Sequence, residues 1–569
     1  MYEYLKKSIA VAGLIFLPAL LLFNCGSVKV ETLYENGGVA STSPIAAEIG
    51  LKILEDGGNA VDAAVAVGFA LAVCYPEAGN IGGGGFALVY SEDDKTVEAL
   101  DFREKAPSAA GRDMYLDDSG LVIPGSSLLG AKAAGVPGTV AGMFELWRRY
   151  GTRDWYELLQ PAIVLADTGF IVSDYIARSM AEQKDSLAIF HETGMIFHPD
   201  GRKLLSGDRF IQKDLSETLE RIALDTLDGF YSGRTAELIA ASMTKNGGLI
   251  SLEDLQSYNP AWRTPIHFTF DSLDIYSMPP PSSGGVILGE ILKILEPFDL
   301  ALYGVGSAEY IHLTAEACRL AYADRAVHLC DPEFTENPIT ELLDSAYLES
   351  RCRLIDPHLA GNSSKIGSGL PEKAAESEST THYCIADRFG NVVSLTYTLN
   401  TSFGSKLVVE GAGFLLNNEM DDFSIKPGVA NVYGLVGGRS NEIAPGKRML
   451  SSMTPTIVLY RGKPCLALGS PGGSKIITTV AQALIDFDRF GMNLQDIVTQ
   501  PRFHHQWLPD TLFLETGGFD INIKQDLISR GHMIYERSRY GDLQIISINN
   551  DRLITGASDP RHEGVFRGY

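Results

Sequence analysis

STTH, residues 379–382, opens the stretch that decides the fold of this chain. It follows a polar run from Gly367 to Ser379, for which we predict no fixed structure, and it precedes a segment, Tyr383 to Asn400, with the pattern of a β-hairpin. If the chain is cut before Thr380, that residue becomes the amino terminus of a strand. An N-terminal threonine carries a nucleophilic hydroxyl and a basic amine on one residue, so no separate histidine is needed. We therefore consider Thr380 as a nucleophile, against the alternative of a Ser/Thr cluster that only starts a strand.

The composition is that of a large globular protein. The 569 residues are 45% hydrophobic, which is enough for a sizeable core in one large domain or two. The formal net charge of −24 argues against a nucleic-acid partner, because such a surface needs a basic face. It is compatible with a soluble enzyme that acts on small molecules.

The first 25 residues have the pattern of an export signal. Lys6 and Lys7 precede an apolar run at 8–23, which is too short to span a bilayer comfortably, and Cys25 follows it. We predict a signal peptide over residues 1–25 and an exported protein, either periplasmic or anchored to a membrane through an acylated Cys25. Leu22-Phe23-Asn24 departs from the small residues that usually precede a lipoprotein cysteine, so an ordinary signal peptide is the alternative.

The remaining cysteines give no zinc motif. They show no CxxC spacing and no paired histidine pattern, so we expect no metal site. An oxidising compartment would permit a disulfide between Cys330 and Cys352, but the sequence does not establish one. The six cysteines are Cys74, Cys318, Cys330, Cys352, Cys384 and Cys465.

Helical and strand patterns together indicate a layered fold. Helices are predicted over 46–54, 60–73, 139–149, 215–222, 234–245 and 308–327. Strands are predicted over 86–90, 98–102, 383–386, 392–397, 456–460, 465–468, 512–515 and 543–548. The region from Val136 to Ile355 is mostly helical by pattern, and 361–379 is predicted to be a surface segment with little fixed structure. The sum is an α/β (α+β) fold whose helices and antiparallel strands stack as α-β-β-α layers.

The sequence GSPGGS at 469–474 is a candidate oxyanion hole. Adjacent glycines allow two backbone N–H groups to point into a cavity, and a helix that begins near Lys475 would add its positive dipole end. The alternatives are a plain turn or a phosphate loop. A phosphate loop is disfavoured because neither GxxxxGK[ST] nor GxGxxG spacing is present. The glycines at 82–85 also lack both spacings, and we predict a packing turn there.

A few polar residues could recognise the head group of a free α-amino acid. Arg103 ends a predicted strand, where its guanidinium could clamp a carboxylate, and a surface ion pair is the alternative. Ser451 and Ser452 offer hydroxyl donors. The run NNEMDDF at 417–423 could hold an ammonium group or calcium. Calcium is the less favoured ligand, because the alternating oxygen ligands of a calcium loop are missing.

Several motifs together resemble the γ-glutamyltransferase family. They lie at 57–64, 82–86, 380–383, 396–400, 417–423, 431–438, 451–456, 469–474 and 501–507. The resemblance runs from about Gly38 to the C terminus. It implies a four-layer αββα N-terminal-nucleophile hydrolase whose precursor cleaves itself between Ser379 and Thr380. The large subunit, 26–379, and the small catalytic subunit, 380–569, would form one domain as a heterodimer.

The resemblance also implies roles for individual residues. Thr380 would be the nucleophile with its own amine as base, and Thr398 would hydrogen-bond to it. Gly472 and Gly473 would supply the oxyanion hole. The α-carboxylate of a γ-glutamyl group would be held by Arg103, Ser451 and Ser452, and its α-ammonium by Asn400, Glu419 and Asp422. Tyr433, in a lid loop at 427–438, would form the wall of the pocket.

The implied activity is cleavage of the γ-glutamyl amide bond of glutathione and related compounds. The γ-glutamyl group would pass through an ester with Thr380 to water or to an amino acid or dipeptide acceptor. No cofactor is implied. The alternatives are a related acylase or poly-γ-glutamate-cleaving enzyme of the same fold, and a non-catalytic surface lipoprotein. The lid with Tyr433 favours a small γ-glutamyl substrate.

Overall fold

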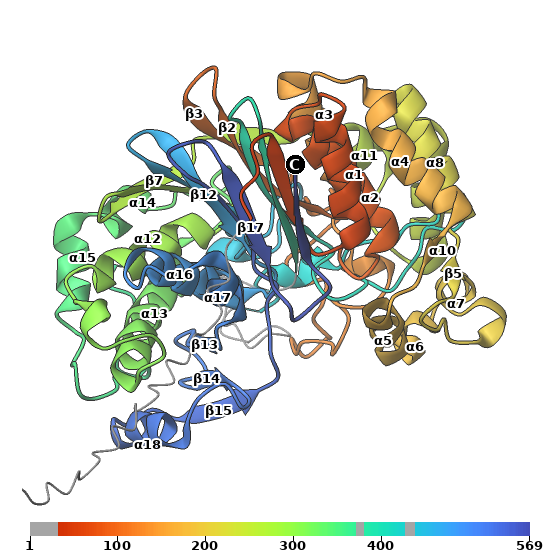
Figure 1. The fold of residues 1–569 in the computed structure, drawn as a ribbon. Helices are drawn as coiled ribbons and strands as arrows, with labels where there is room; N and C mark the ends of the chain where they lie inside the picture. Colours follow the sequence, from red (N-terminus) through yellow and green to blue (C-terminus); the bar gives the residue numbers. More distant parts are fainter. Residues whose placement is uncertain (1–31, 371–379, 427–438) are drawn as a thin grey trace, which may run out of the picture. The chain divides into compact units, whose positions relative to one another are not determined.

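Two antiparallel β-sheets face each other at the centre of the protein, and helices cover the outer face of each sheet (Figure 1). The computed structural model describes residues 32–370, 380–426 and 439–569, and 33–569 form one compact unit. Cys25, Ser379 and Tyr433 lie outside the described residues. The predicted four-layer αββα arrangement is confirmed.

The first sheet has Thr380 beside one of its central strands. Its seven strands follow the order β18-β1-β9-β10-β2-β3-β6, and every neighbouring pair is antiparallel. The strands are β18 (Val565–Gly568), β1 (Gly37–Ser41), β9 (Thr381–Asp387), β10 (Val392–Thr398), β2 (Gly84–Ser91), β3 (Thr96–Asp101) and β6 (Ala261–Arg263). Strand β9, which follows Thr380, therefore lies between β1 from the start of the described chain and its hairpin partner β10.

The second sheet brings together strands from the middle and the C-terminal part of the chain. Its order is β17-β16-β12-β11-β8-β7. The strands are β17 (Ile554–Ser558), β16 (Gln544–Ile548), β12 (Lys463–Gly469), β11 (Thr456–Tyr460), β8 (Leu273–Ser277) and β7 (Ile266–Phe270). A small three-stranded sheet contains β13 (Phe503–His504), β14 (Leu512–Glu515) and β15 (Ile534–Arg537). A small two-stranded sheet contains β4 (Phe170–Ile171) and β5 (Arg209–Phe210).

The hairpin β7–β8 corrects the prediction of a mostly helical region from Val136 to Ile355. Each of these strands has only five residues, and in each of them buried side chains alternate with more exposed ones. Such short alternation gives a weak sequence signal beside long helices. The pairing of β8 with β11, far along the chain, secures the hairpin in the second sheet.

Eleven helices accompany the first sheet along the chain. They are α1 (Pro44–Glu55), α2 (Ala60–Cys74), α3 (Thr139–Tyr150), α4 (Trp155–Thr168), α5 (Asp174–Glu182), α6 (Lys184–Leu187), α7 (His191–Phe197), α8 (Lys213–Asp225), α9 (Asp228–Tyr231), α10 (Gly233–Asn246) and α11 (Leu252–Gln256). Every residue of α2 is buried, as its continuous apolar pattern predicts. Asn59 and Asp62 close its first turn with a reciprocal capping box.

The helices beside the second sheet form the other outer layer. They are α12 (Gly284–Leu295), α13 (Ala308–His328), α14 (Ile339–Leu342), α15 (Ser345–Cys352), α16 (Ser474–Asp488) and α17 (Leu494–Thr499). Helix α18 (Ile521–Ser529) packs against α13 and the small strand β15. Figure 1 shows α12, α13 and α16 on the side of the sheets opposite to α1 and α2. Within the described part of the chain, no helix has the length and apolar character needed to cross a membrane.

Strand β9 contributes side chains to both hydrophobic cores. Tyr383 and Ile385 pack in the core between the first sheet and its helices, whereas Cys384 and Ala386 pack in the core that includes the second sheet. This division follows from the two-residue period of a strand. The Tyr383 hydroxyl also donates a 2.9 Å hydrogen bond to the carbonyl of Ala64 in α2. The strand that follows Thr380 is thus fixed from both faces.

The segment from Gly361 to Leu370 has fixed partners, which corrects the prediction of little fixed structure across 361–379. The Gly361 amide donates to Glu316 at 3.0 Å, and the Ser363 amide donates to Asp510 at 2.8 Å. Residues 371–379 lie outside the described residues. The polar composition of 361–370 predicts exposure, but these backbone groups are bound by carboxylates from distant segments.

All six described cysteines are free thiols. The sequence does not decide whether Cys330 and Cys352 form a disulfide, and in this structure they do not. Cys74 and Cys384 are buried, and burial raises the pKa of Cys74 to about 12. A thiol of this kind stays protonated and packs as a small apolar side chain.

Candidate active site

Thr380 lies at the start of β9, directly opposite the end of β10. Thr381 pairs with Tyr397, so the same antiparallel register places Thr380 across from Thr398. Thr380 is 8% exposed and Thr398 is 1% exposed. The hydroxyl oxygen of Thr398 accepts a 2.8 Å hydrogen bond from the amide of Asn400. The two threonines that the sequence singled out therefore lie opposite each other where β9 begins and β10 ends.

His382 points into the space between the sheets and bonds to groups other than Thr380. Its Nδ1 lies 2.7 Å from the Thr396 hydroxyl, and its Nε2 lies 3.0 Å from the Cys384 thiol. Burial lowers the pKa of His382 to about 3, so the ring is neutral at pH 7. Among the described residues, His382 has no hydrogen bond to Thr380.

A chain of polar contacts joins the residue after Thr380 to the glycine turn at 470–473. The hydroxyl oxygens of Thr381 and Thr42 lie 3.3 Å apart, and Thr42 donates to Asp542 at 2.6 Å. The amide of Asp542 donates in turn to the Ser470 hydroxyl at 3.1 Å. Gly469, at the end of β12, packs so closely on the His382 ring that an added Cβ would lie 2.4 Å from it. The glycine turn thus lies beside the start of β9.

Gly472 and Gly473 have backbone conformations that favour glycine. Their φ angles are 127° and 60°, and Gly473 immediately precedes α16. Neither N–H donates to another group among the described residues. Two free N–H groups at a helix N terminus suit the negative oxygen of a tetrahedral intermediate.

Arg103 meets two carboxylates in a buried cluster. Its Nη1 lies 2.7 Å from Glu419 Oε2, and its Nη2 forms a short ion pair with Asp422. Glu419 and Asp422 both belong to a short 3₁₀ turn, η4 (Glu419–Asp422). Glu104 adds a third carboxylate at 3.6 Å. The sequence argument placed Arg103 on a substrate carboxylate and the acids on an ammonium, and the structure shows that these opposite charges also meet directly.

The carboxylates of this cluster outnumber its cation. Burial raises the pKa of Glu419 and of Glu104 to about 8, and it raises the pKa of Asp422 well above its usual range. Within the described residues, neither carboxylate oxygen of Glu104 has a hydrogen-bond partner, and Asp422 Oδ1 has none. A buried site with excess acceptors is suited to a ligand that brings a positive charge and N–H donors.

Asn400 connects the two threonines to the charged cluster. It adopts a positive φ of 74°, which is uncommon for a residue other than glycine. Its side-chain N–H donates to the Asn418 carbonyl at 3.0 Å, next to Glu419. Its side-chain oxygen is buried and has no partner among the described residues. That oxygen is therefore available to an ammonium donor.

Ser451 and Ser452 come shortly after Met449, whose backbone carbonyl is bound by Arg103. Arg103 Nε donates to the Met449 carbonyl at 3.3 Å. The Ser452 hydroxyl accepts a 2.8 Å hydrogen bond from Arg325 of α13, and Arg325 also donates to the Ser283 hydroxyl at 2.8 Å. The sequence reasoning missed Arg325 and Glu104. The segment 308–327 carries several charged residues, and nothing in the sequence marks Arg325 among them as a site residue.

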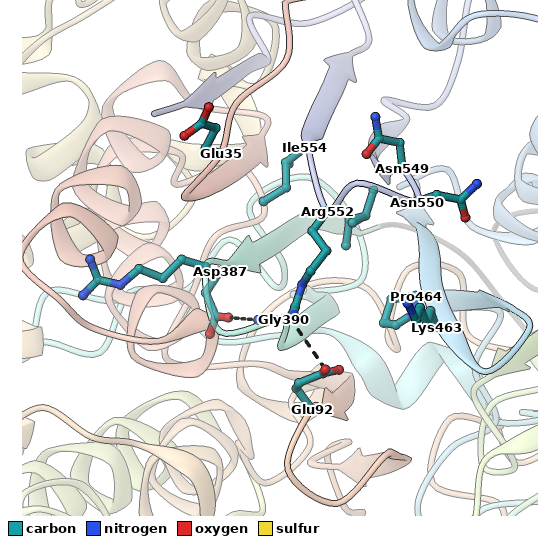
Figure 2. A pocket seen from close by; sticks show the side chains of 12 residues that line it. Glu35, Glu92, Asp387, Gly390, Lys463, Pro464, Asn549, Asn550, Arg552 and Ile554 are labelled. Atoms are coloured by element: carbon teal, nitrogen blue, oxygen red, sulfur yellow. Dashed lines mark hydrogen bonds and ion pairs between the residues drawn. The ribbon is translucent and has the colours of Figure 1, made fainter.

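A pocket of about 270 Å³ lies at the far end of β9 and belongs to different residues (Figure 2). It is lined by turns that include Asp387, Lys463 and Arg552. Asp387 accepts hydrogen bonds from the turn amides, and Arg552 lies 3.6 Å from Glu92. Seven residues of strand separate Asp387 from Thr380, a rise of about 23 Å. This pocket is therefore remote from the two threonines.

Comparisons with known proteins identify the family to which this chain belongs. A model of the family described as gamma-glutamyltranspeptidase matches residues 46–569. The glutathione hydrolase proenzyme of Escherichia coli (strain K12) is 48% identical over 539 residues, covering 94% of this chain and 92% of that protein.

Solved structures that align with this chain include an acylase and a gamma-glutamyltranspeptidase. Cephalosporin acylase from Bacillus halodurans aligns with a TM-score of 0.85 at 27% identity, covering 98% of this chain and 99% of that one. A chain of Helicobacter pylori gamma-glutamyltranspeptidase aligns with a TM-score of 0.57 at 46% identity, covering 58% of this chain and 94% of its own length. The family model and the E. coli relative both span most of the chain, and together they show that this protein is a member of the gamma-glutamyltranspeptidase family.

Proposed function

We propose that this protein is a self-processing γ-glutamyltransferase that hydrolyses glutathione and related γ-glutamyl compounds. The observation that carries the proposal is the strand register that places Thr380 across from Thr398. Asn400 is hydrogen-bonded to Thr398 and to Asn418, the neighbour of Glu419 in the buried Arg103 cluster. A nucleophile next to a site of opposite charges suits a substrate that has both an amide and a zwitterionic head group.

The proposed reaction passes through an ester. The Thr380 hydroxyl attacks the γ-amide carbon, and its proton moves to the Thr380 α-amine while the N–H groups of Gly472 and Gly473 hold the oxyanion. The protonated amine then gives its proton to the departing nitrogen as the amide bond breaks. Water, or the amine of an amino acid or dipeptide, attacks the ester and restores the hydroxyl. Thr398 positions Thr380 across the strand pair.

The head group is held by charge at both ends. Arg103, Ser451 and Ser452 hold the α-carboxylate, and Asn400, Glu419 and Asp422 hold the α-ammonium. When the substrate enters, its two charges replace part of the direct pairing between Arg103 and its carboxylates, so the buried charges keep their partners. This exchange explains selectivity for a γ-linked residue with a free α-amino acid group. Tyr433 of the lid loop would complete the pocket.

Formation of the nucleophile requires cleavage of the bond between Ser379 and Thr380. The products would be a large subunit, 26–379, and a small subunit, 380–569. The proenzyme name of the E. coli relative supports this step. Export, with removal of residues 1–25 or with Cys25 as a lipid anchor, rests on the sequence pattern alone.

An acylase is the second candidate, favoured by the alignment with the B. halodurans cephalosporin acylase. The test is release of p-nitroaniline from γ-glutamyl-p-nitroanilide by the processed protein, compared with cleavage of a glutaryl or other acyl amide that lacks the α-ammonium. We expect turnover of the γ-glutamyl compound and at least about 100-fold less of the acyl amide, because the latter leaves Asp422 without a cation. Faster cleavage of the acyl amide would reverse the assignment.

The pH dependence should reveal the charge of Glu419. Burial raises its pKa to about 8, so at pH 6 the carboxyl is protonated, neutral and a poor partner for an ammonium group. As the pH rises toward 8, the carboxylate forms, and we expect kcat/KM to increase. The α-amine of Thr380 titrates in the same range, near 7.7–8.0 in model peptides. Comparison with Glu419→Gln separates the two groups, since the pH profile of this variant should show only the titration of the Thr380 α-amine. Identical pH profiles of kcat/KM for the variant and the wild type would contradict the role of Glu419.

A further inference from the structure

Three side chains of metal-ligand type meet away from Thr380, between α13 and the segment after α18. His312 and Glu316 lie one turn apart on α13, and His532 follows α18. Their ligand atoms all lie within 4.8 Å of one another, and all three residues are buried. His312 Nδ1 and His532 Nε2 are 2.8 Å apart. The proposed reaction uses none of them.

The hydrogen bond on the other side of His312 orients its ring for metal binding. His312 Nε2 lies 2.8 Å from the carbonyl oxygen of Asp356, and only a protonated ring nitrogen can donate to that oxygen. Nδ1 is then the lone-pair atom that faces His532. A carbonyl acceptor behind the ring is the usual support of a metal-bound histidine.

His532 Nε2 is the donor of the hydrogen bond between the two rings, because His312 Nδ1 accepts it. A metal ion between them needs the other tautomer of His532, with its proton on Nδ1 and a lone pair on Nε2. Nδ1 of His312 and Nε2 of His532 now share one hydrogen bond. A tetrahedral ion with Zn–N distances of 2.0–2.1 Å would hold them about 3.3 Å apart. The rings would therefore have to separate by only about half an ångström.

Glu316 can accept a further partner. Its carboxylate accepts hydrogen bonds from the Gly361 amide and from Arg319, each at 3.0 Å. Arg319 also pairs with Asp510, so the two acids and one guanidinium carry a net charge of −1. An ionised carboxylate has about four acceptor positions, and the excess negative charge favours a cation.

We propose that His312, Glu316 and His532 form a binding site for a transition-metal dication of the zinc type. Two imidazoles and one carboxylate are a ligand set that zinc and neighbouring metals accept, with a fourth position left for water. The ion would tie α13 to the segments that contain Gly361 and His532. The site is distinct from the γ-glutamyl chemistry, so its role is to fasten these elements together.

The test uses the tag-free, processed full chain after chelator treatment and dialysis. Titration with ZnCl₂ is followed by calorimetry, and titration with CoCl₂ by the visible absorption of four-coordinate cobalt. We expect one ion per molecule and a rise in melting temperature with Zn²⁺, because a ligand that binds only the folded state stabilises it. The cobalt spectrum should indicate nitrogen and oxygen ligands without the strong charge-transfer bands of thiolates.

Two variants and one control decide the assignment. His312→Gln can keep the donor to Asp356 and should bind Zn²⁺ at least about 10-fold more weakly, as should His532→Gln, since each removes a direct ligand. His358→Gln changes an exposed histidine outside the cluster and should bind as the wild type does. All three should retain γ-glutamyl turnover. No stoichiometric ion in the wild type, or equal affinity in both folded cluster variants, would show that the cluster is only a hydrogen-bonded packing contact.

Discussion

Thr380→Ala should abolish both cleavage of the precursor and turnover of γ-glutamyl-p-nitroanilide. The substitution removes the hydroxyl oxygen proposed to attack the Ser379 carbonyl and the substrate amide, while the β9 backbone keeps its partners on β1 and β10. A denaturing gel should show one uncut chain in place of the two pieces, 26–379 and 380–569. Loss of a nucleophile typically costs about 10⁶-fold in kcat.

Thr380→Ser and Thr269→Ala are the matched controls for this prediction. Thr380→Ser keeps the hydroxyl, so it should still cut itself and turn over substrate. Thr269 is an exposed residue of β7 in the other sheet, and its replacement should leave both activities unchanged. If Thr380→Ala still splits into two fragments, the assignment of Thr380 as nucleophile is wrong.

Asp422→Asn should lower kcat/KM for γ-glutamyl substrates by about 100-fold, mainly through KM. Asp422 is buried against Arg103. Burial raises its pKa, but a bound ammonium group favours the ionised form, and the substitution removes that negative charge. Loss of one partner from a buried, hydrogen-bonded charge pair costs about 3 kcal/mol, which corresponds to a factor of about 100. Initial rates across a range of substrate concentrations measure the effect.

Glu104→Gln is the control within the same cluster. Glu104 lies 3.6 Å from Arg103, but it has no proposed contact with substrate. Burial raises its pKa to about 8, so at pH 7 the carboxyl is mostly protonated and glutamine resembles it in charge and shape. We expect a change of less than about threefold in kcat/KM. Equal losses in Asp422→Asn and Glu104→Gln would mean that the cluster acts through folding, not through the substrate ammonium.

The parts of the fold that the sequence predicts are those with strong local patterns. Helix α2 is apolar on all sides, and the hairpin β9–β10 has a turn in which Asp387 accepts hydrogen bonds from the amides of Phe389 and Gly390. The strands β1, β17 and β18 were not among the predicted strands. They are short, and β18 is only half-buried, so their structure depends on pairing with distant segments and not on local alternation.

The candidate site divides in the same way. Thr380, Gly472 and Gly473 stand out in the sequence because a cut site and adjacent glycines have direct chemical meaning. Motif similarity supplied the joint roles of Arg103 and Asp422, which are 319 residues apart. Arg325 could not be predicted, since nothing in its own segment indicates a hydroxyl of Ser452 as its partner. The cluster of His312, Glu316 and His532 was missed for that reason too, and the expectation of no metal site rested on local spacing alone.

The order of strands in the first sheet has a consequence for how the mature enzyme unfolds. Strands β9, β10 and β18 follow the proposed cut. In the sheet, β1, which precedes the cut, lies between β18 and β9, and β2, which also precedes it, pairs with β10. Before the cut, refolding is a first-order event within one molecule, and closing the connecting loop costs only a few kcal/mol. After the cut, the same strands belong to two molecules, so refolding becomes second-order and slows on dilution. Self-cleavage would therefore turn a reversible fold into one whose lifetime is set by its unfolding rate.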